Sequence, residues 1–410
     1  MFRHTFRALS HRAFRRYFIG QGVSQTGNWI QQVVLSWLAY ENSGSALWLG
    51  LVVAAGQAPL LLAPLGGLLA DRHDRRRLLL ISHGLGLLVA CWLIVLSLTG
   101  SPGLPALLLA SLALGGINAL EMPVRHAFIA NLVGGTELLS NAVALNSLVF
   151  NGARLIGPPL AGVLFAAFGA PLCFALNALS YVAALHSLLR IRGGRRIAPD
   201  GKACLRQSFD WLRTTRPARW LLFTATLTSI SLTPVMTLLP VYAHDIFDVG
   251  PTGLGQLLGA SGIGALAATL WLAARRTPLR LEVSMTGGAL LFGLSCIGFA
   301  GNQIFWLACL LLAVGGASLV AVTTSSTTLL QWLVPDALRG RIMALHGMFY
   351  LGSMPLGSLL AGAIAERWSV PIAFMTGGAT MLALTALLAV QLPRLAREIE
   401  QTRRKAMAAA

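Results

Sequence analysis

Polar side chains in the first long apolar region share one face of a predicted helix. Their spacing of four, three and four residues places them on the same side of that helix. Side-chain amides are costly in lipid, so the stripe predicts either a water-filled cavity or hydrogen bonds between packed helices. Trp29 would add aromatic surface beside it. The stripe consists of Gln21, Gln25, Asn28 and Gln32.

A carboxylate and a guanidinium stand four residues apart in a later apolar region. Glu121 and Arg125 can pair across one helical turn, although Pro123 lies between them and perturbs that turn. Glu121 is our candidate for a group that binds and releases a proton. A plain salt bridge at the cytoplasmic surface is the alternative. Asn118 precedes the pair on the same helix and is a further cavity candidate.

Arg154 lies in the middle of the next apolar region, one turn after Asn151. The planar guanidinium binds carboxylate, catecholate or phosphate groups at two points. We therefore expect Arg154 to bind an anionic group of a substrate or to make neutral contacts at a gate. A structural pair with a buried acid is the alternative.

Hydroxyl side chains form two further groups in the second half of the chain. Thr226 and Thr233 belong to a stripe beside Pro234, and Thr324 belongs to the run from Thr323 to Thr328. Serine and threonine can bond the carbonyls of their own helix. Cavity lining and helix packing therefore remain equally supported for these three threonines.

No enzyme chemistry can be assembled from the sequence. The five cysteines are scattered without a CxxC pair, which argues against a disulfide framework or a metal site. The sequence has no GxxxxGK[ST] nucleotide-binding motif and hence no sign of an ATP-driven pump. A nucleophile with a base and an orienting group is also missing. We expect neither an enzyme nor a bound cofactor.

The elements that position these residues are apolar runs of membrane-spanning length. The chain of 410 residues is 56% hydrophobic and 11% charged, far below the roughly 25% charged of soluble domains, and its mean hydropathy is +0.71. Runs of about 20 residues suit helices that cross a bilayer. The predicted spans are 17–40, 46–70, 78–98, 104–123, 140–168, 171–189, 220–242, 252–274, 282–300, 303–328, 342–366 and 371–392.

A short polar loop, Gly66 to Arg77, separates the second and third spans. Its arginines predict a cytoplasmic position. A carboxylate at the end of a span suits a helix N-terminus or an arginine fork, so we expect this loop to form a gate. The expected gating residues here are Asp71, Arg72, Arg75 and Arg76.

The basic residues fix an expected orientation. Of the 31 lysines and arginines, all except Arg154 and Arg367 fall at termini or in loops on one side of a twelve-span topology. The positive-inside rule then places both termini in the cytoplasm. The net charge is +17. The basic residues lie between apolar runs and form no separate basic face, so the charge does not indicate nucleic-acid binding.

The two halves of the chain repeat each other at a shift of 200 residues. Gly157 matches Gly357 and Phe174 matches Phe374. Parallel halves are typical of transporters that rock two bundles about a central site. We expect bundles at 1–189 and 220–392, a cytoplasmic linker at 190–219 and a basic tail at 393–410. In the linker, residues 209–212 predict an amphipathic helix on the inner leaflet.

Two motifs resemble those of the major facilitator superfamily. The stretch from Gly67 to Arg76 resembles the loop between its second and third helices, with Asp74 where the family usually has a glycine. Gly157, Pro158 and Gly162 resemble the glycine- and proline-rich fifth helix of its antiporting exporters, and Gly255 and Gly259 offer a smooth partner face. Together with Gly27-Asn28-Trp29 and the sequence 123–127, they resemble the bacterial exporter branch, which includes the enterobactin exporter and macrolide-efflux permeases.

The resemblance implies a twelve-helix fold in two pseudo-symmetric six-helix bundles. It also implies export of small amphipathic molecules of the drug or siderophore type by alternating access, with protons moving inward. The family's coupling residues do not carry over, because Ser111 stands near the usual helix-four arginine and Asn28 is neutral. We expect a monomer in the bacterial cytoplasmic membrane. An importer of a polar nutrient and a non-transporting sensor or scaffold are the alternatives.

Overall fold

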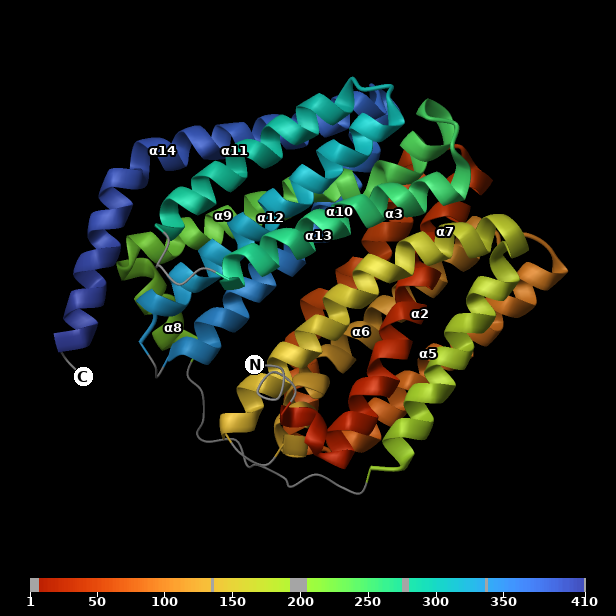
Figure 1. Cartoon of the computed structure of the whole chain (residues 1–410), viewed down its shortest axis with the longest axis horizontal. Coiled ribbons are helices and arrows are strands. Elements are labelled where there is room, and N and C mark those ends of the chain that lie inside the picture. Colours follow the sequence, from red (N-terminus) through yellow and green to blue (C-terminus); the bar gives the residue numbers. More distant parts are fainter. Residues whose placement is uncertain (1–6, 134–135, 192–204, 275–279, 336–337, 409–410) are drawn as a thin grey trace. The chain divides into compact units, whose positions relative to one another are not determined.

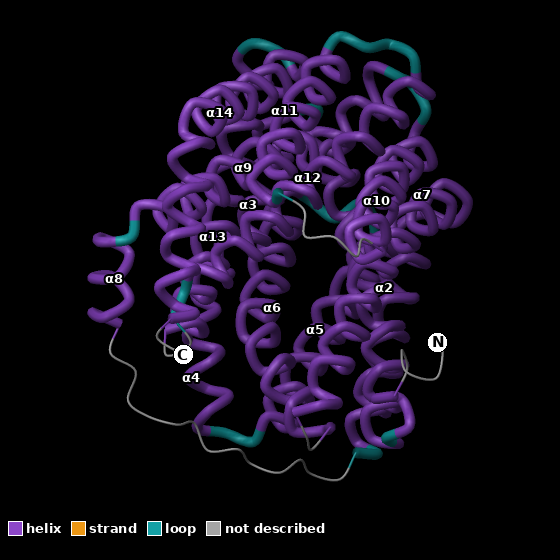
Figure 2. The backbone as a smooth tube through the Cα atoms, turned by 60° about the vertical axis from the view of Figure 1, so that its left-hand side comes forward, coloured by secondary structure: helices purple, strands orange, loops and turns teal. Residues whose placement is uncertain are grey.

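All regular structure in the described part of the chain is helical. The computed structural model describes residues 7–133, 136–191, 205–274, 280–335 and 338–408, and Figure 2 shows only helices and loops over these ranges. Ten of the helices described there are long and apolar enough to cross a membrane. The predicted all-α membrane fold is confirmed, while the count of twelve spans remains a prediction.

The helices form two compact units. The described residues up to 191, together with Ala243–Gly259, form the first unit; residues 205–242 and those from 260 on form the second. The bundle limits expected from the sequence, 1–189 and 220–392, remain predictions. The first unit contains η1 (Arg7–Ser10), α2 (Arg12–Ser43), α3 (Ala46–Gln57), η2 (Ala58–Leu62), α4 (Ala63–Arg72), α5 (Arg75–Thr99), α6 (Leu104–Val133) and α7 (Thr136–Leu189).

The second unit continues the helical order along the chain (Figure 1). The π-helical segment η3 (Tyr242–Ile246) and α10 (Gly250–Ala274) each contribute residues to both units. The remaining elements are α8 (Leu205–Thr214), α9 (Arg216–Val241), α11 (Leu281–Ala300), α12 (Phe305–Leu333), α13 (Arg339–Arg367) and α14 (Val370–Ala408).

Helix boundaries in the first unit follow local capping chemistry. Gly44 ends α2 with a φ of 61°, a conformation that costs glycine little. The Ser45 side chain then accepts a hydrogen bond from the backbone N–H of Trp48 at the start of α3. Asp74 caps α5 in the same way. These caps define the short turns that the sequence predicts between spans.

The fifth and sixth predicted spans both lie in α7, which consists of two helical segments joined at a break. Asn141–Leu189 contains 49 residues, about 70 Å at 1.5 Å per residue, and the hydrocarbon core is only about 30 Å thick. Gly169 breaks the helical geometry with φ 75° and ψ −175°, at the position between the two predicted spans. This break favours two crossings in α7, and their number remains a prediction.

The predicted end of the fourth span at Pro123 is wrong. Helix α6 continues through Pro123 to Val133. An internal proline removes one backbone hydrogen bond, and the turns after it compensate by burying apolar side chains. Phe128 and Ile129 lie in a core cluster with Phe14 and Tyr17 of α2.

Internal repetition extends to packing. A Cβ on Gly157 would lie 2.5 Å from the Cβ of Trp29 on α2, and one on Gly357 would lie 2.5 Å from Oγ1 of Thr233 on α9. Each glycine therefore lets one helix of its own unit pack closely against another. Phe174 and Phe374 are both buried.

Candidate functional site

Three ionisable side chains meet in the interior of the first unit. Oε2 of Glu121 on α6 lies 3.5 Å from Nδ1 of His83 on α5. Oε1 of Glu121 lies 3.5 Å from Nη1 of Arg125. Exposed fractions of 2% for the His83 side chain, 3% for Glu121 and 10% for Arg125 show that the group is buried. The predicted pairing of Glu121 with Arg125 is present, but in the interior.

The surrounding residues come from α2 and α7. Gln21 donates from Nε2 to Oε1 of Glu121 over 3.4 Å, and the Tyr181 ring lies 6.0 Å from the His83 ring. Gly86 leaves room for that tyrosine, since a Cβ there would lie 2.6 Å from its ring. Four helices of the first unit thus converge on one carboxylate.

The predicted amide stripe of α2 divides into buried and exposed members. Gln21 and Gln25 are buried, Asn28 is half-buried and Gln32 is exposed. The neighbouring Gln31 is buried instead, and its Oε1 accepts a 2.7 Å hydrogen bond from Asn177 on α7. Of the four, only Gln21 has a described hydrogen bond to another of the predicted site residues. That the stripe lines a cavity remains a prediction.

The candidates on α6 and α7 are spread over different surfaces. Asn118 and Asn151 are exposed and Arg154 is half-buried. Asn151 donates to the Ser147 carbonyl of its own helix at 2.9 Å. Trp29 packs edge-on against Phe150 at 6.3 Å. Neither Asn118 nor Asn151 has a described contact with the buried carboxylate. The substrate roles of Asn118, Asn151 and Arg154 remain predictions.

Two of the three threonine candidates in the second unit donate hydrogen bonds to carbonyls of their own helix. Thr226 donates to the Leu222 carbonyl at 3.1 Å and Thr233 to the Ser229 carbonyl at 2.7 Å. Thr324 on α12 is exposed. Both bonds stay within α9, so cavity lining and helix packing remain open for these threonines.

The arginines of the loop 66–77 hold helix ends of the first unit. Arg75 donates to the carbonyls of Ala70 and Ala127 and, at 2.8 Å, to Oδ1 of Asn131. Arg76 donates to the carbonyls of Leu188 and Leu189, both at 2.8 Å. Arginine at helix C-terminal carbonyls is stabilising.

Asp71 interacts with the same loop only weakly. Its Oδ1 lies 3.8 Å from Nη2 of Arg75, and 45% of its side chain is exposed. Arg72 ends α4 and is also exposed. The gating role of these residues remains a prediction.

The glycine- and proline-rich part of α7 packs on the start of α10, as expected for Gly255 and Gly259. A Cβ on Gly162 would lie 2.5 Å from the Pro251 carbonyl oxygen, and one on Gly255 would lie 2.7 Å from that of Pro158. Backbone meets backbone here, which only small residues allow.

A second polar cluster joins α2 to η3. The Tyr40 hydroxyl donates to the Asp245 carboxylate, which also contacts Nδ1 of His244. The His244 ring lies against the rings of Trp37 and Tyr40 at 5.6 and 5.7 Å. These groups form a continuous polar and aromatic contact that sequence spacing does not reveal.

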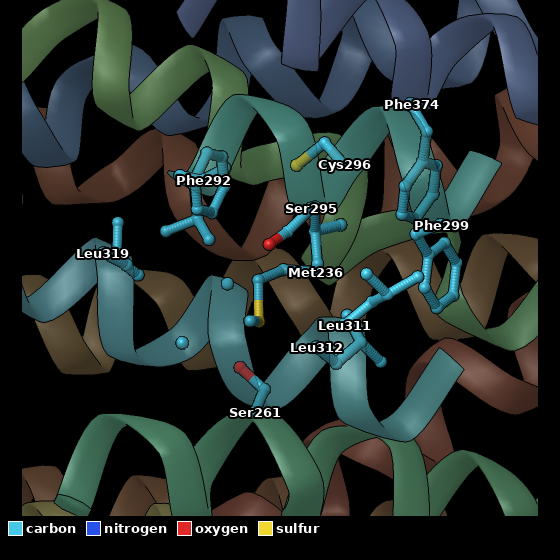
Figure 3. A pocket seen from close by; sticks show the side chains of 14 residues that line it. Met236, Ser261, Phe292, Ser295, Cys296, Phe299, Leu311, Leu312, Leu319 and Phe374 are labelled. Atoms are coloured by element: carbon cyan, nitrogen blue, oxygen red, sulfur yellow. The ribbon is translucent and has the colours of Figure 1, made fainter. Parts of the chain in front are cut away.

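The described part of each unit contains a cavity that is not lined by the predicted site residues. One of about 380 Å³ lies among α4, α5 and α6, and its lining is apolar except for Ser82. The other, in the second unit, holds only about 10 Å³, roughly one water; Ser261, Ser295 and Met236 point into it (Figure 3).

Sequence reasoning missed His83. The only signal was its isolation, because it is the single charged or imidazole side chain in the predicted span 78–98. A lone histidine gives no spacing pattern. Its pairing with Glu121 depends on how α5 packs on α6, which sequence periodicity does not determine.

Ionisable groups buried between the helices of an all-helical membrane fold are typical of proteins that move ions or solutes across the membrane. A solved structure, the nucleoside transporter NupG, shares the fold with a TM-score of 0.74 at 13% identity, covering 93% of this chain and 99% of that one. The protein belongs to the transmembrane secretion effector family of the major facilitator superfamily, whose model matches residues 3–409. It is a membrane transporter of small molecules and not an enzyme.

Two characterised relatives are similar over most of their length. The Staphyloferrin A transporter of Staphylococcus aureus is 28% identical over 88% of this chain and 91% of its own. The multidrug efflux pump Tap of Mycolicibacterium fortuitum is 28% identical over 91% of this chain and 94% of its own. The predicted membership of the major facilitator superfamily is therefore confirmed.

Proposed function

We propose that the protein exports small amphipathic molecules of the drug or siderophore type by alternating access, with protons moving in the opposite direction. The relatives named as an efflux pump and as a Staphyloferrin A transporter support this substrate range. We propose a monomer in the bacterial cytoplasmic membrane, with both termini cytoplasmic and bundles at 1–189 and 220–392 that rock about a central site.

The observation that carries the antiport proposal is the burial of Glu121. An ionisable side chain in a membrane span is costly, and such residues are typically found on substrate paths or proton relays. A carboxylate enclosed by side chains of four helices changes their interactions each time it gains or loses a proton. Glu121 is thus the proposed protonatable group.

Reconstitution in proteoliposomes tests this function. We propose ethidium, an amphipathic cation, as the first probe, with a pH gradient imposed across the vesicle membrane. Uphill accumulation of ethidium on the proton-rich side, and its loss when an ionophore collapses the gradient, would support antiport. Movement of ethidium only down its gradient would contradict proton coupling, and no movement of ethidium or of a wider set of drugs and siderophores would contradict export of this class.

A further inference from the structure

The buried carboxylate has a partner that can itself take up a proton. His83 Nδ1 lies 3.5 Å from Oε2 of Glu121 and has no hydrogen bond to any described residue. Nε of Arg125 and the Tyr17 hydroxyl are also buried without a hydrogen bond to any described residue. Distances of 3.4 to 3.5 Å around Glu121 are at the long end for hydrogen bonds. The cluster therefore has room to rearrange its contacts.

Helix geometry gives the depth of the cluster. His83 lies eight residues after the start of α5 and Gln21 nine after the start of α2. At 1.5 Å per residue both lie roughly 12–14 Å from the charged ends of their helices. With those ends at the membrane surface, the cluster lies inside the hydrocarbon region, where a fixed charge needs a functional reason.

Two charge arrangements of the cluster follow from its protonation. With His83 neutral, Glu121 balances Arg125, which is four residues further on the same helix. One added proton brings the three groups to a net charge of +1. If it binds Nδ1 of His83, the new imidazolium faces Oε2 and forms an ion pair between α5 and α6. Gln21 and Tyr17 on α2, and Tyr181 on α7, are the other polar or titratable groups facing the cluster.

We infer that the transported proton, assigned above to Glu121, resides on Nδ1 of its partner His83 and not on the carboxylate itself. Proton binding then links α5 to α6, and proton release returns Glu121 to Arg125. The proton comes from water on one side of the membrane, adds to Nδ1, and leaves to water on the other side; no other bond is made or broken. This inference rests on the proposed antiport for its role in transport, whereas proton binding itself can be measured without a substrate.

The substrate-free test is nitrogen NMR of the purified, full-length protein labelled at its histidines. Acidification from about pH 8 to about pH 5 spans the range in which histidine titrates. Among the imidazole signals that change from neutral to charged, we expect one to be missing in His83→Gln. In Glu121→Gln the same signal should stay neutral down to a lower pH, because the carboxylate that favours the charged imidazole is gone. His346 on α13 is also buried, with Nε2 unpartnered in the described part of the chain, so His346→Gln is the matched control.

The transport test separates the inference from the proposed function. In vesicles driven by a pH gradient, His83→Gln should lose about tenfold in uphill ethidium accumulation and keep downhill equilibration, while His346→Gln should keep both. If the wild type shows no gradient-driven transport, antiport fails but the NMR result still judges His83. An imidazole at position 83 that stays neutral throughout, or full coupling in a folded His83→Gln, would overturn the inference. If that variant is poorly folded, His83→Asn serves in its place.

Discussion

The Asp74 carboxylate accepts a 2.9 Å hydrogen bond from the backbone N–H of Arg77 and thereby caps α5. The residue that replaces the family's usual glycine in the loop 66–77 thus has a structural role of its own. Asp71, three residues earlier, makes only a long ion pair with Arg75. The two carboxylates of one loop therefore make different contacts.

Asp71→Asn should impair transport and leave membrane insertion intact. We predict that the carboxylate stabilises one state of a gate, so its loss should change the balance of states by about 1–3 kcal/mol. Vesicle flux and the accessibility of cytoplasmic cysteine probes measure the effect. Asp74→Asn is the matched control, because asparagine caps a helix as well as aspartate. Equal behaviour of the two variants would argue against a special role for Asp71.

Gly162→Ala should lower thermal stability, because the new Cβ would lie 2.5 Å from the Pro251 carbonyl oxygen. Overpacking of this kind costs about 1–3 kcal/mol. Gly152→Ala on the same helix is the control, since a Cβ there meets nothing within 4 Å. Thermal unfolding followed by tryptophan fluorescence compares the two, and an unchanged midpoint for Gly162→Ala would mean that α7 and α10 are not in close contact.

Gly169→Ala should also be destabilising, but through the backbone. Its φ of 75° with ψ near 180° is a region that side chains rarely adopt, at a cost of about 1–3 kcal/mol. Gly301→Ala, at φ −95° with open space around it, should be close to neutral. If both variants unfold at the wild-type temperature, the break in α7 is not held in this conformation.

Arg154→Lys should reduce transport much more than folded yield. The substitution keeps the charge and loses the planar fork that binds carboxylates or phosphates at two points. Fluorescence-detected size exclusion reports the yield, and vesicle flux reports transport. Parallel losses in the two measurements would assign Arg154 a structural role.

Local features were predictable from the sequence, and packing across helices was not. The loop 66–77, the apolar spans and the pairing of Glu121 with Arg125 depend on spacing along one helix. In contrast, the predicted stripe did not include Gln31, which is buried and bonded to Asn177, because the position of α7 decides which face of α2 is covered. His83 and the contact between Tyr40 and Asp245 likewise depend on helices far apart in the chain.

The polarity of α2 has a consequence for how the protein is made. Each described helix longer than 25 residues contains an apolar candidate span, except α2. A translocon inserts each nascent segment according to that segment's own apolarity. The amide partner of α2, Asn177, follows Gln31 by 146 positions, so roughly 7–30 s of synthesis separate them at 5–20 residues per second. During that interval the nascent α2 depends on α3, or on an insertase, to shield its polar face, and ribosome-bound chains that end before α7 should release it from the bilayer.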